Sequence, residues 1–353
     1  MHLIGRTPAR RRLSRGFSVV ELMVAITLSL ILLSGVVALF VSSRKSYESN
    51  EHLARIQETG RFILDQIVRD IRAAGYLGCA KEIPFNNALN DAASSLLWDF
   101  ANPIRGFDAT GSAWLPALDT TLVPSATVVN SDVLVIRAPD PDAPARRITT
   151  AMASPTDDIT IAPATPAYPA GTTLMASDCN AVSVFEVTGY TAGVVSHADS
   201  TVQAAETDGV ASAGNSSAGV GYAFQAGALV FPVRTVIYYL RQSATAGRGN
   251  SLWRRVGRAA PQELAEGVDT LQVLYGVDSN GDRIADDYLT ANSVTHWENI
   301  ISVRVALLVR SLEQYGKNPD TAHEVLGVDI AAAGDNRERL MFSTTTTLRN
   351  KAL

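Results

Sequence analysis

The chain has 353 residues, with 35 acidic and 30 basic side chains, and a formal net charge of −5 at pH 7. Residues 1–16, MHLIGRTPARRRLSRG, hold five of the basic side chains and no acid, so the remainder has a formal charge of −10 (25 minus 35). Direct nucleic-acid capture is therefore disfavoured, because it relies on basic side chains that neutralise phosphates.

An apolar run follows this basic segment at a Gly-Phe junction and spans residues 16–41, with one charged residue, Glu21. From Leu22 to Val41 no residue is ionisable, and this length is enough for a helix to cross a bilayer. The positive-inside rule keeps residues 1–16 in the cytoplasm and sends the rest across. A charge at mid-membrane costs roughly 2.5 to 3.5 kcal/mol, so Glu21 indicates a specific partner.

The position of cleavage decides what that partner is. An ordinary secretory signal is cut after its apolar segment, but here the segment continues into a helical pattern. A cut between Gly16 and Phe17 would retain the segment and give Phe17 a free amine, the cation that Glu21 needs. The alternative is a plain signal anchor with an incidental acid.

A helical stripe continues beyond the membrane segment. Gly75 is the expected stop. Charged residues of alternating sign occupy the other face: Glu51, Arg55, Glu58, Arg61, Asp65, Arg69, Asp70 and Arg72. Phe17 to Ala74 would form one rod of about 85 to 90 Å. Gly60 is either a close-packing site or a local loosening. Small or apolar residues recur every three or four positions at Ile56, Gly60, Ile63, Ile67, Ile71 and Ala74.

The segment from Leu77 to Leu353, called the head, is predicted to be β-rich, giving an α+β fold. Residues 85–123 are expected to be long packed loops and residues 191–221 a flexible excursion, so one β domain with insertions or two lobes would fit. The predicted strands are rich in Val, Ile, Thr, Tyr and Phe and span residues 133–137, 159–162, 172–176, 182–188, 228–240, 252–256, 270–275, 300–310 and 340–348.

The two cysteines, Cys79 and Cys179, are expected to form a disulfide, because a pair outside the cytoplasm is more often bridged than free. The bridge would close a loop of about 100 residues and contribute around 4.7 kcal/mol on the chain-entropy model. Two unpaired buried thiols are the alternative.

One segment could hold a cation. Oxygen ligands in DSNGDRIAD are spaced as in calcium loops. The pattern departs from an EF-hand, because Arg283 stands where the glycine belongs and Leu289 where the final Glu belongs. A solvated hairpin is the favoured interpretation, and Ca²⁺ the alternative cofactor. The candidate ligands are Asp278, Asn280, Asp282 and Asp286.

Enzyme motifs are weak. The four histidines after residue 16 lie in no HExxH motif, Gly214 to Ala218 fails GxSxG, and GVGYAF from Gly219 lacks a third glycine. A structural, non-enzymatic role is therefore expected, with an anchored hydrolase as the alternative.

Gly16, Phe17 and Glu21, followed by the apolar run, resemble the class III signal of type IV prepilins. The resemblance implies that a prepilin peptidase cuts after Gly16 and methylates Phe17. It also implies that Glu21 pairs with the amine of a neighbouring subunit during assembly. The implied domains are a leader (1–16), a transmembrane assembly half (17–43) and an amphipathic half (44–76) of one helix, and the head (77–353).

Three further segments resemble the PilW type of minor pilin, and thin matches separate them. The resemblance implies a low-abundance subunit that primes type IV pilus assembly and sits at or near the tip. The segments are GRFILDQIVRDIRAAGYLGC (60–79), SDCNAVSVFEVTG (177–189), and LAEGVDTLQVLYGVDSNGDRIADDY (264–288) with ISVRVALLVRS (301–311).

The expected partners are other major and minor pilins, the peptidase, the inner-membrane assembly platform and a tip adhesin. The expected location is the inner membrane of a Gram-negative bacterium with the head in the periplasm, and then the pilus. A minor pseudopilin of a type II secretion system, or a ligand-binding tip pilin, are the alternative functions.

Overall fold

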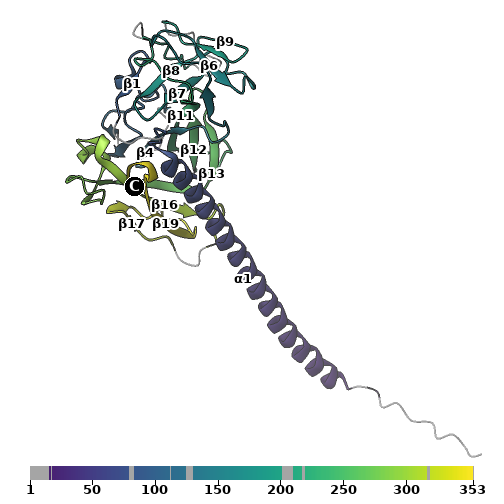
Figure 1. Cartoon of the computed structure of the whole chain (residues 1–353). Helices are drawn as coiled ribbons and strands as arrows, with labels where there is room; N and C mark the ends of the chain where they lie inside the picture. The colour runs from purple at the N-terminus through teal and green to yellow at the C-terminus, as the bar shows by residue number, and fades with distance from the viewer. Residues whose placement is uncertain are drawn as a thin grey trace, which may run out of the picture. The chain divides into compact units, whose positions relative to one another are not determined.

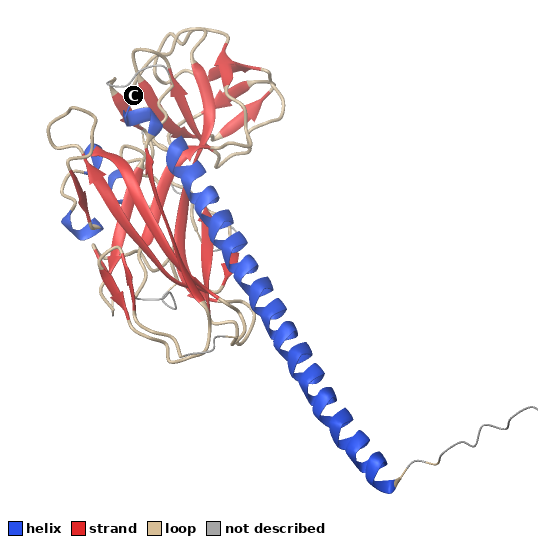
Figure 2. Ribbon diagram, turned by 90° about the horizontal axis from the view of Figure 1, so that it is seen from below, coloured by secondary structure: helices blue, strands red, loops and turns tan. Residues whose placement is uncertain are grey.

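The computed structural model describes residues 16, 18–78, 83–111, 113–124, 130–200, 210–216, 219–315 and 319–352. The chain divides into two compact units, Met1–Leu53 and Ala54–Leu353. Their boundary lies within the long helix α1 (Val19–Ala73), and each unit is considered by itself. The predicted α+β class is confirmed: α1 is followed by a head whose regular secondary structure is mainly β-strand, joined by loops (Figures 1 and 2).

The second half of α1 packs on the head through the predicted stripe. Every residue of that stripe is buried, whereas the opposite face is mostly exposed. The helix ends at Ala73, and Gly75 follows with a φ of +69°, a left-handed conformation that glycine adopts without strain.

Thirteen strands of the described residues form one branched sheet. They are β1 (Phe85–Asn87), β2 (Ile104–Ala109), β3 (Trp114–Leu115), β4 (Val133–Pro139), β5 (Arg146–Ile148), β6 (Ile159–Ala162), β7 (Thr173–Ser177), β8 (Val182–Glu186), β9 (Gly189–Thr191), β10 (Val194–Ser196), β11 (Leu229–Gln242), β12 (Asn250–Val256) and β13 (Gln262–Glu266).

Strand β11 joins two parts of this sheet. Its first residues, Leu229 to Pro232, pair with β7, while Val233 to Tyr238 pair with β4. Its far half, Val236 to Gln242, pairs with β12 on the opposite edge. One strand therefore runs through both lobes of the head, the upper lobe around β5–β10 and the lower lobe around β4 and β12 (Figure 1).

A second sheet has the order β15-β14-β16-β19. Its strands are β14 (Val268–Val277), β15 (Asp287–Leu289), β16 (Ile300–Arg310) and β19 (Arg339–Thr347). A hairpin of β17 (His323–Val325) and β18 (Val328–Ile330) places Val325 beside Ala306 and Leu308 of β16. Short 3₁₀ helices and the terminal helix complete the fold: η1 (Ala92–Ser94), η2 (Ala291–Ser293), η3 (Trp297–Asn299) and α2 (Arg349–Ala352).

The largest core lies between α1, the lower lobe and the four-stranded sheet. The helix contributes four isoleucines, and the strands contribute side chains such as Tyr238, Val305 and Leu307. The upper lobe has its own core, which includes Phe185 and Phe224. Packing of the second half of α1 therefore depends on the lower lobe and the four-stranded sheet, and not on the upper lobe.

Two sequence predictions about loops were wrong in part. Residues 85–123 contain β1, β2 and β3, and residues 191–221 contain β10. In the second region His197 and Asn215 are also buried, while residues 201–209, 217 and 218 lie outside the described part. Short strands with glycine and mixed polar residues lack the alternation that reveals a strand.

Candidate functional site

The start of α1 holds Glu21 in a reciprocal hydrogen-bonded turn. The Glu21 Oε2 atom accepts the backbone N–H of Ser18 at 3.1 Å, and the Ser18 Oγ atom accepts the N–H of Val20 at 3.3 Å. This is the pattern of a capping box, S-x-x-E, which the sequence analysis did not use. Gly16 and Glu21 are exposed, and Phe17 lies outside the described residues. Glu21 thus has a local structural role besides the predicted role in assembly.

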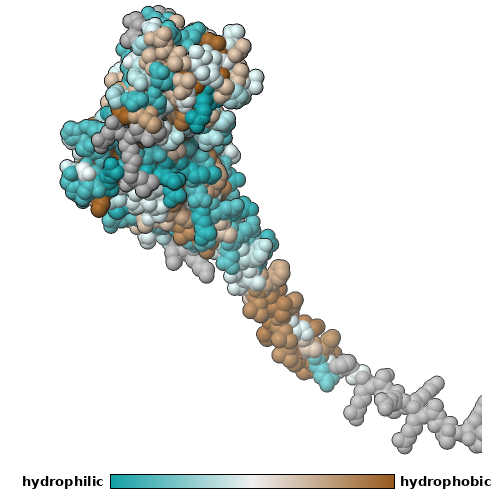
Figure 3. All heavy atoms as spheres, in the orientation of Figure 1, coloured by the Kyte–Doolittle hydropathy of each residue, from teal (hydrophilic) through white to brown (hydrophobic). Residues whose placement is uncertain are grey.

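The first half of α1 exposes its apolar side chains. One window of this helix has a mean hydropathy of 2.7 and no buried residue, and the helix is long and apolar enough to cross a membrane. Large side chains such as Leu32 and Leu39 are more than 70% exposed, and the surface here is mostly apolar (Figure 3). Such a surface requires lipid or other subunits around it.

A buried polar contact fixes the second half of α1 on the head. Asp70, which the sequence analysis placed on the charged outer face, is only 7% exposed. Its Oδ2 atom accepts the Tyr238 hydroxyl at 2.6 Å and pairs with Arg254 Nη2 at 3.3 Å. Burial, together with the Asp70 charge, raises the pKa of Tyr238 far above its ordinary value. The prediction for Asp70 was wrong because its partners lie about 170 and 180 residues away in sequence.

Strand β19 and the C-terminal segment close over the end of the helix. The ring of Phe342 lies directly over Gly60. Arg72 Nε donates to Thr346 Oγ1 at 3.3 Å, and Asn350 Nδ2 donates to the carbonyl oxygen of Ala74 at 3.0 Å. Gly60 is therefore a close-packing site, which decides between the two interpretations of that residue.

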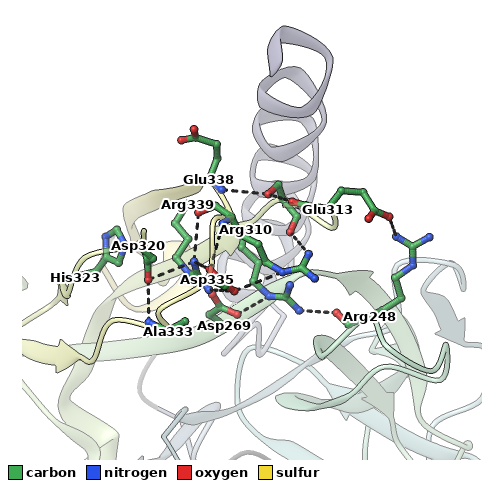
Figure 4. Close-up of polar contacts among 12 residues, drawn as sticks. Arg248, Asp269, Arg310, Glu313, Asp320, His323, Ala333, Asp335, Glu338 and Arg339 are labelled. Atoms are coloured by element: carbon green, nitrogen blue, oxygen red, sulfur yellow. Dashed lines mark hydrogen bonds and ion pairs between the residues drawn. The ribbon is translucent and has the colours of Figure 1, made fainter. Parts of the chain in front are cut away.

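An ion cluster anchors the first residue of β19 (Figure 4). The Arg339 side chain is 4% exposed; its Nε pairs with Asp269 of β14 at 2.7 Å, and its Nη1 pairs with Asp335 at 2.6 Å. Asp269 also pairs with Arg310 Nε at the end of β16, at 2.8 Å. The hydrogen bond from Arg339 lowers the pKa of Asp335 below its ordinary value, although burial opposes the shift. The cluster ties three neighbouring strands together at one end of the sheet.

A buried carboxylate joins the two sheets. Asp132, 5% exposed, accepts the N–H of Ala109 in β2 at 3.0 Å and the N–H of Val273 in β14 at 2.9 Å. Burial raises its pKa to about 7, against the two hydrogen bonds, and the nearby charge of Asp108 adds to the rise. Asp108 itself accepts two N–H groups of η2, at 2.7 and 2.6 Å.

The predicted disulfide is only half within the described residues. Cys179 follows β7, whereas Cys79 lies outside the described part. Two residues before each cysteine, Ser177 Oγ donates to the carbonyl oxygen of Leu77, so the segments that precede the two cysteines lie side by side. This contact supports the pairing of Cys79 with Cys179, which stays a prediction.

The aspartate-rich loop, residues 278–286, is held by hydrogen bonds among its own residues. Asp278 accepts the N–H groups of Gly281 at 2.7 Å and Arg283 at 2.8 Å, and Asn280 Nδ2 donates to Asp282 and Asp286 at 3.2 and 3.1 Å. Over the described ranges, no group of three or more His, Cys, Asp or Glu side chains is arranged to hold a metal ion. Calcium binding at Asp278, Asn280, Asp282 and Asp286 stays a prediction.

Three of the four histidines after residue 16 have local partners of a structural kind. The Nε2 atom of buried His197 lies 2.8 Å from the Asp157 carbonyl oxygen. His296 pairs with Glu298 at 2.8 Å, and His323 with Asp320 at 2.9 Å. These contacts account for the positions of the three rings.

Comparison with known proteins identifies two family models on this chain. Residues 11–37 match the prokaryotic N-terminal methylation motif. Residues 237–350 match type IV pilus-assembly protein W, the PilW family. No curated protein matches the chain.

One solved structure is similar over part of the chain. A type IV-like pilin from Thermus thermophilus is 16% identical, and the match covers 34% of this chain and 70% of that pilin with a TM-score of 0.21. A likeness this weak carries no argument by itself. The N-terminal methylation motif falls on the segment that holds the Gly16-Phe17 junction, and the segment similar to the PilW family of type IV pilus-assembly proteins holds most of the strands that pack on the second half of α1.

Proposed function

We propose that this protein is a minor pilin that helps to prime assembly of the type IV pilus and sits at or near its tip. The observation that carries the proposal is where the PilW match falls. Residues 237–350 run from the second half of β11 through β19, and these strands supply most of the core that holds α1. The family-specific part of the head is thus the part that carries the assembly helix.

The mechanism follows from the surface of α1. Before assembly its apolar half lies in the inner membrane, and extraction must replace lipid contacts with contacts to neighbouring helices. After cleavage between Gly16 and Phe17, the new amine of one subunit pairs with Glu21 of the next. Because an unpaired charge in an apolar bundle is costly, this pair fixes the register of one helix against another.

Substitution of Glu21 tests the assembly role against the capping role. Glu21→Gln keeps an acceptor for the Ser18 N–H but removes the charge, whereas Glu21→Ala removes both. We expect both variants to insert and lose their leader normally, and both to reduce incorporation into pili by at least about tenfold. Immunoblots of sheared pili and of membranes measure the two quantities. Normal piliation with Glu21→Gln would contradict the charge-pair role.

The partners of this function are major and minor pilins, the prepilin peptidase, the assembly platform and a tip adhesin. The proposed location is the inner membrane of a Gram-negative bacterium with the head in the periplasm, followed by the pilus. Gly16 is exposed and precedes α1, which suits cleavage there.

A minor pseudopilin of a type II secretion system is the second candidate, since it would use the same apolar helix. Deletion of the gene separates the two functions. Loss of surface pili and twitching with normal exoprotein secretion supports the pilus role. Loss of secretion with normal pili would support the pseudopilin role.

A further inference from the structure

We propose that the free edge of β19 is a strand-docking surface, which an extended segment of a neighbouring pilin subunit joins as an additional strand. The proposal rests on the proposed function and adds the surface by which the head contacts that neighbour. Its evidence is the hydrogen bonding of β19, its composition and its attachment to α1.

Strand β19 lies at the end of its sheet and pairs only with β16 in the described part of the chain. Leu348 N donates to Ile301 O at 2.8 Å, which marks this opposed pair as hydrogen-bonded. Opposed pairs alternate in an antiparallel ladder, so every second residue of β19 aims its N–H and C=O away from β16. These residues also have exposed side chains: Met341, Ser343, Thr345 and Thr347.

The composition of this edge leaves it open to pairing. Residues 340–348, LMFSTTTTL, contain no charge and no proline. Natural edge strands usually avoid pairing by being short or by carrying charges or proline. Other edges of the head follow that rule, because β15 has three residues and begins with Asp287, and β13 carries Glu263 and Glu266. Strand β19 has nine residues, and beyond Arg339, whose side chain is buried in the ion cluster, its edge carries no charge and no proline.

The edge is also held in place before any partner arrives. Arg339 at its start is fixed in the ion cluster with Asp269 (Figure 4), and Thr346 near its end bonds to Arg72 of α1. A fixed edge loses little conformational entropy when a strand is added.

Attachment to α1 identifies the occupant. Because Phe342 packs on Gly60, the docking edge borders the second half of α1, residues 54–73, and the proposed function brings the helices of other subunits beside α1. A neighbour whose helix lies beside α1 brings its own head and loops next to β19. The matching chemistry is an extended, uncharged segment that supplies alternating N–H and C=O groups.

Site-specific photo-crosslinking in the full chain, in cells that make pili, tests the position of the partner. A photoreactive residue is placed at Ser343 and at Thr345 in turn, with exposed Ile284 as the control position. We expect both edge positions to crosslink to peptides of another pilin, at sites two residues apart in that pilin. We expect no crosslink from residue 284. Crosslinks only to a second copy of this chain, or to no pilin, would overturn the proposal.

Proline and lysine variants test whether the edge is used. Thr345→Pro removes an N–H that faces away from β16. The matched Thr346→Pro removes an N–H that donates to a backbone carbonyl of β16. We expect Thr345→Pro to keep a Tm close to that of the wild type but to reduce the crosslink and piliation at least about fivefold, while Thr346→Pro lowers Tm. Thr345→Lys provides the same block without a backbone change.

These outcomes are separate from those that test the proposed function. Wild-type piliation and crosslinking in both Thr345→Pro and Thr345→Lys would overturn the docking edge even where Glu21→Ala abolishes pili. Normal piliation in Glu21→Ala and Glu21→Gln would instead remove the proposed assembly mechanism.

Discussion

Asp132 shows how one buried residue makes the head sensitive to pH. Its carboxylate bridges β2 and β14 while burial raises its pKa from the ordinary 3.8 to about 7. The folded state therefore binds this proton more tightly than the unfolded state, and the stability from this group falls as pH rises from about 4 to about 7. The full effect is on the order of 4 kcal/mol.

We therefore expect Asp132→Asn to flatten the pH dependence. The difference in unfolding free energy between wild type and variant should shift against the wild type as pH rises from 4.5 to 7.5. Urea unfolding of the full chain in detergent measures it, with the exposed carboxylate variant Asp329→Asn as the control. A difference that does not change with pH would show that Asp132 has an ordinary pKa.

The role of a single residue can be predicted from the sequence only where that role depends on residues nearby in the chain. Glu21 was found from its position in the apolar run, and its capping box with Ser18 could also have been found from S-x-x-E. The burial of Asp70 could not, because a charge on a helix face is normally solvated and Tyr238 and Arg254 come from a distant strand pair. The sequence also does not indicate that Asp132 is buried, since a carboxylate at the start of a strand is usually exposed.

The contact between α1 and β19 predicts how a substitution at Gly60 changes the stability of the protein. A Cβ atom at Gly60 would lie 2.5 to 2.7 Å from three ring carbons of Phe342. Although alanine is a better helix former by about 1 kcal/mol, overpacking costs about 1 to 3 kcal/mol. We expect Gly60→Ala to lower Tm by several degrees, in proportion to a loss of about 1 kcal/mol.

Two controls isolate this clash. Gly35→Ala places the same methyl group where no atom lies within 4 Å, so we expect no loss of Tm. Phe342→Leu combined with Gly60→Ala should recover part of the loss relative to the sum of the single variants. A Gly60→Ala variant as stable as the wild type would show that Phe342 moves aside freely.

The elements themselves were mostly visible in the sequence. Predicted strands 159–162 and 300–310 agree with β6 and β16 residue for residue, because both are bounded runs of β-branched and aliphatic residues. The start of β11 lies one residue from its prediction, but its division between two lobes depends on pairing with β4 and β7. Pairing partners are nonlocal and leave no local pattern.

For the molecule as a whole, the segment that matches the PilW model also supplies most of the core around the second half of α1. Residues 237–350 contain the strands that enclose α1, whereas the upper lobe around Phe185 and Phe224 lies before the matched region. The segment similar to PilW therefore supplies β12, the second half of β11 and the four-stranded sheet, which pack on the second half of α1.

The fold class, the long helix and its buried stripe could be predicted because they follow from periodicity and apolar length. The branched sheet and the contacts of β19 and Asn350 with α1 could not, because they depend on segments far apart in the sequence, such as β4 with β11 and Asn350 with Ala74. The family models confirm the N-terminal signal and the PilW segment, which the sequence resemblance had indicated.

The most direct test of the account is mass spectrometry of the mature N-terminus from purified pili and membranes. We predict a chain that begins at Phe17 with a methylated amine, and that lacks all five arginines of residues 1–16. A mature chain that keeps those arginines, or that begins after the apolar segment, would contradict the pairing of a new amine with Glu21.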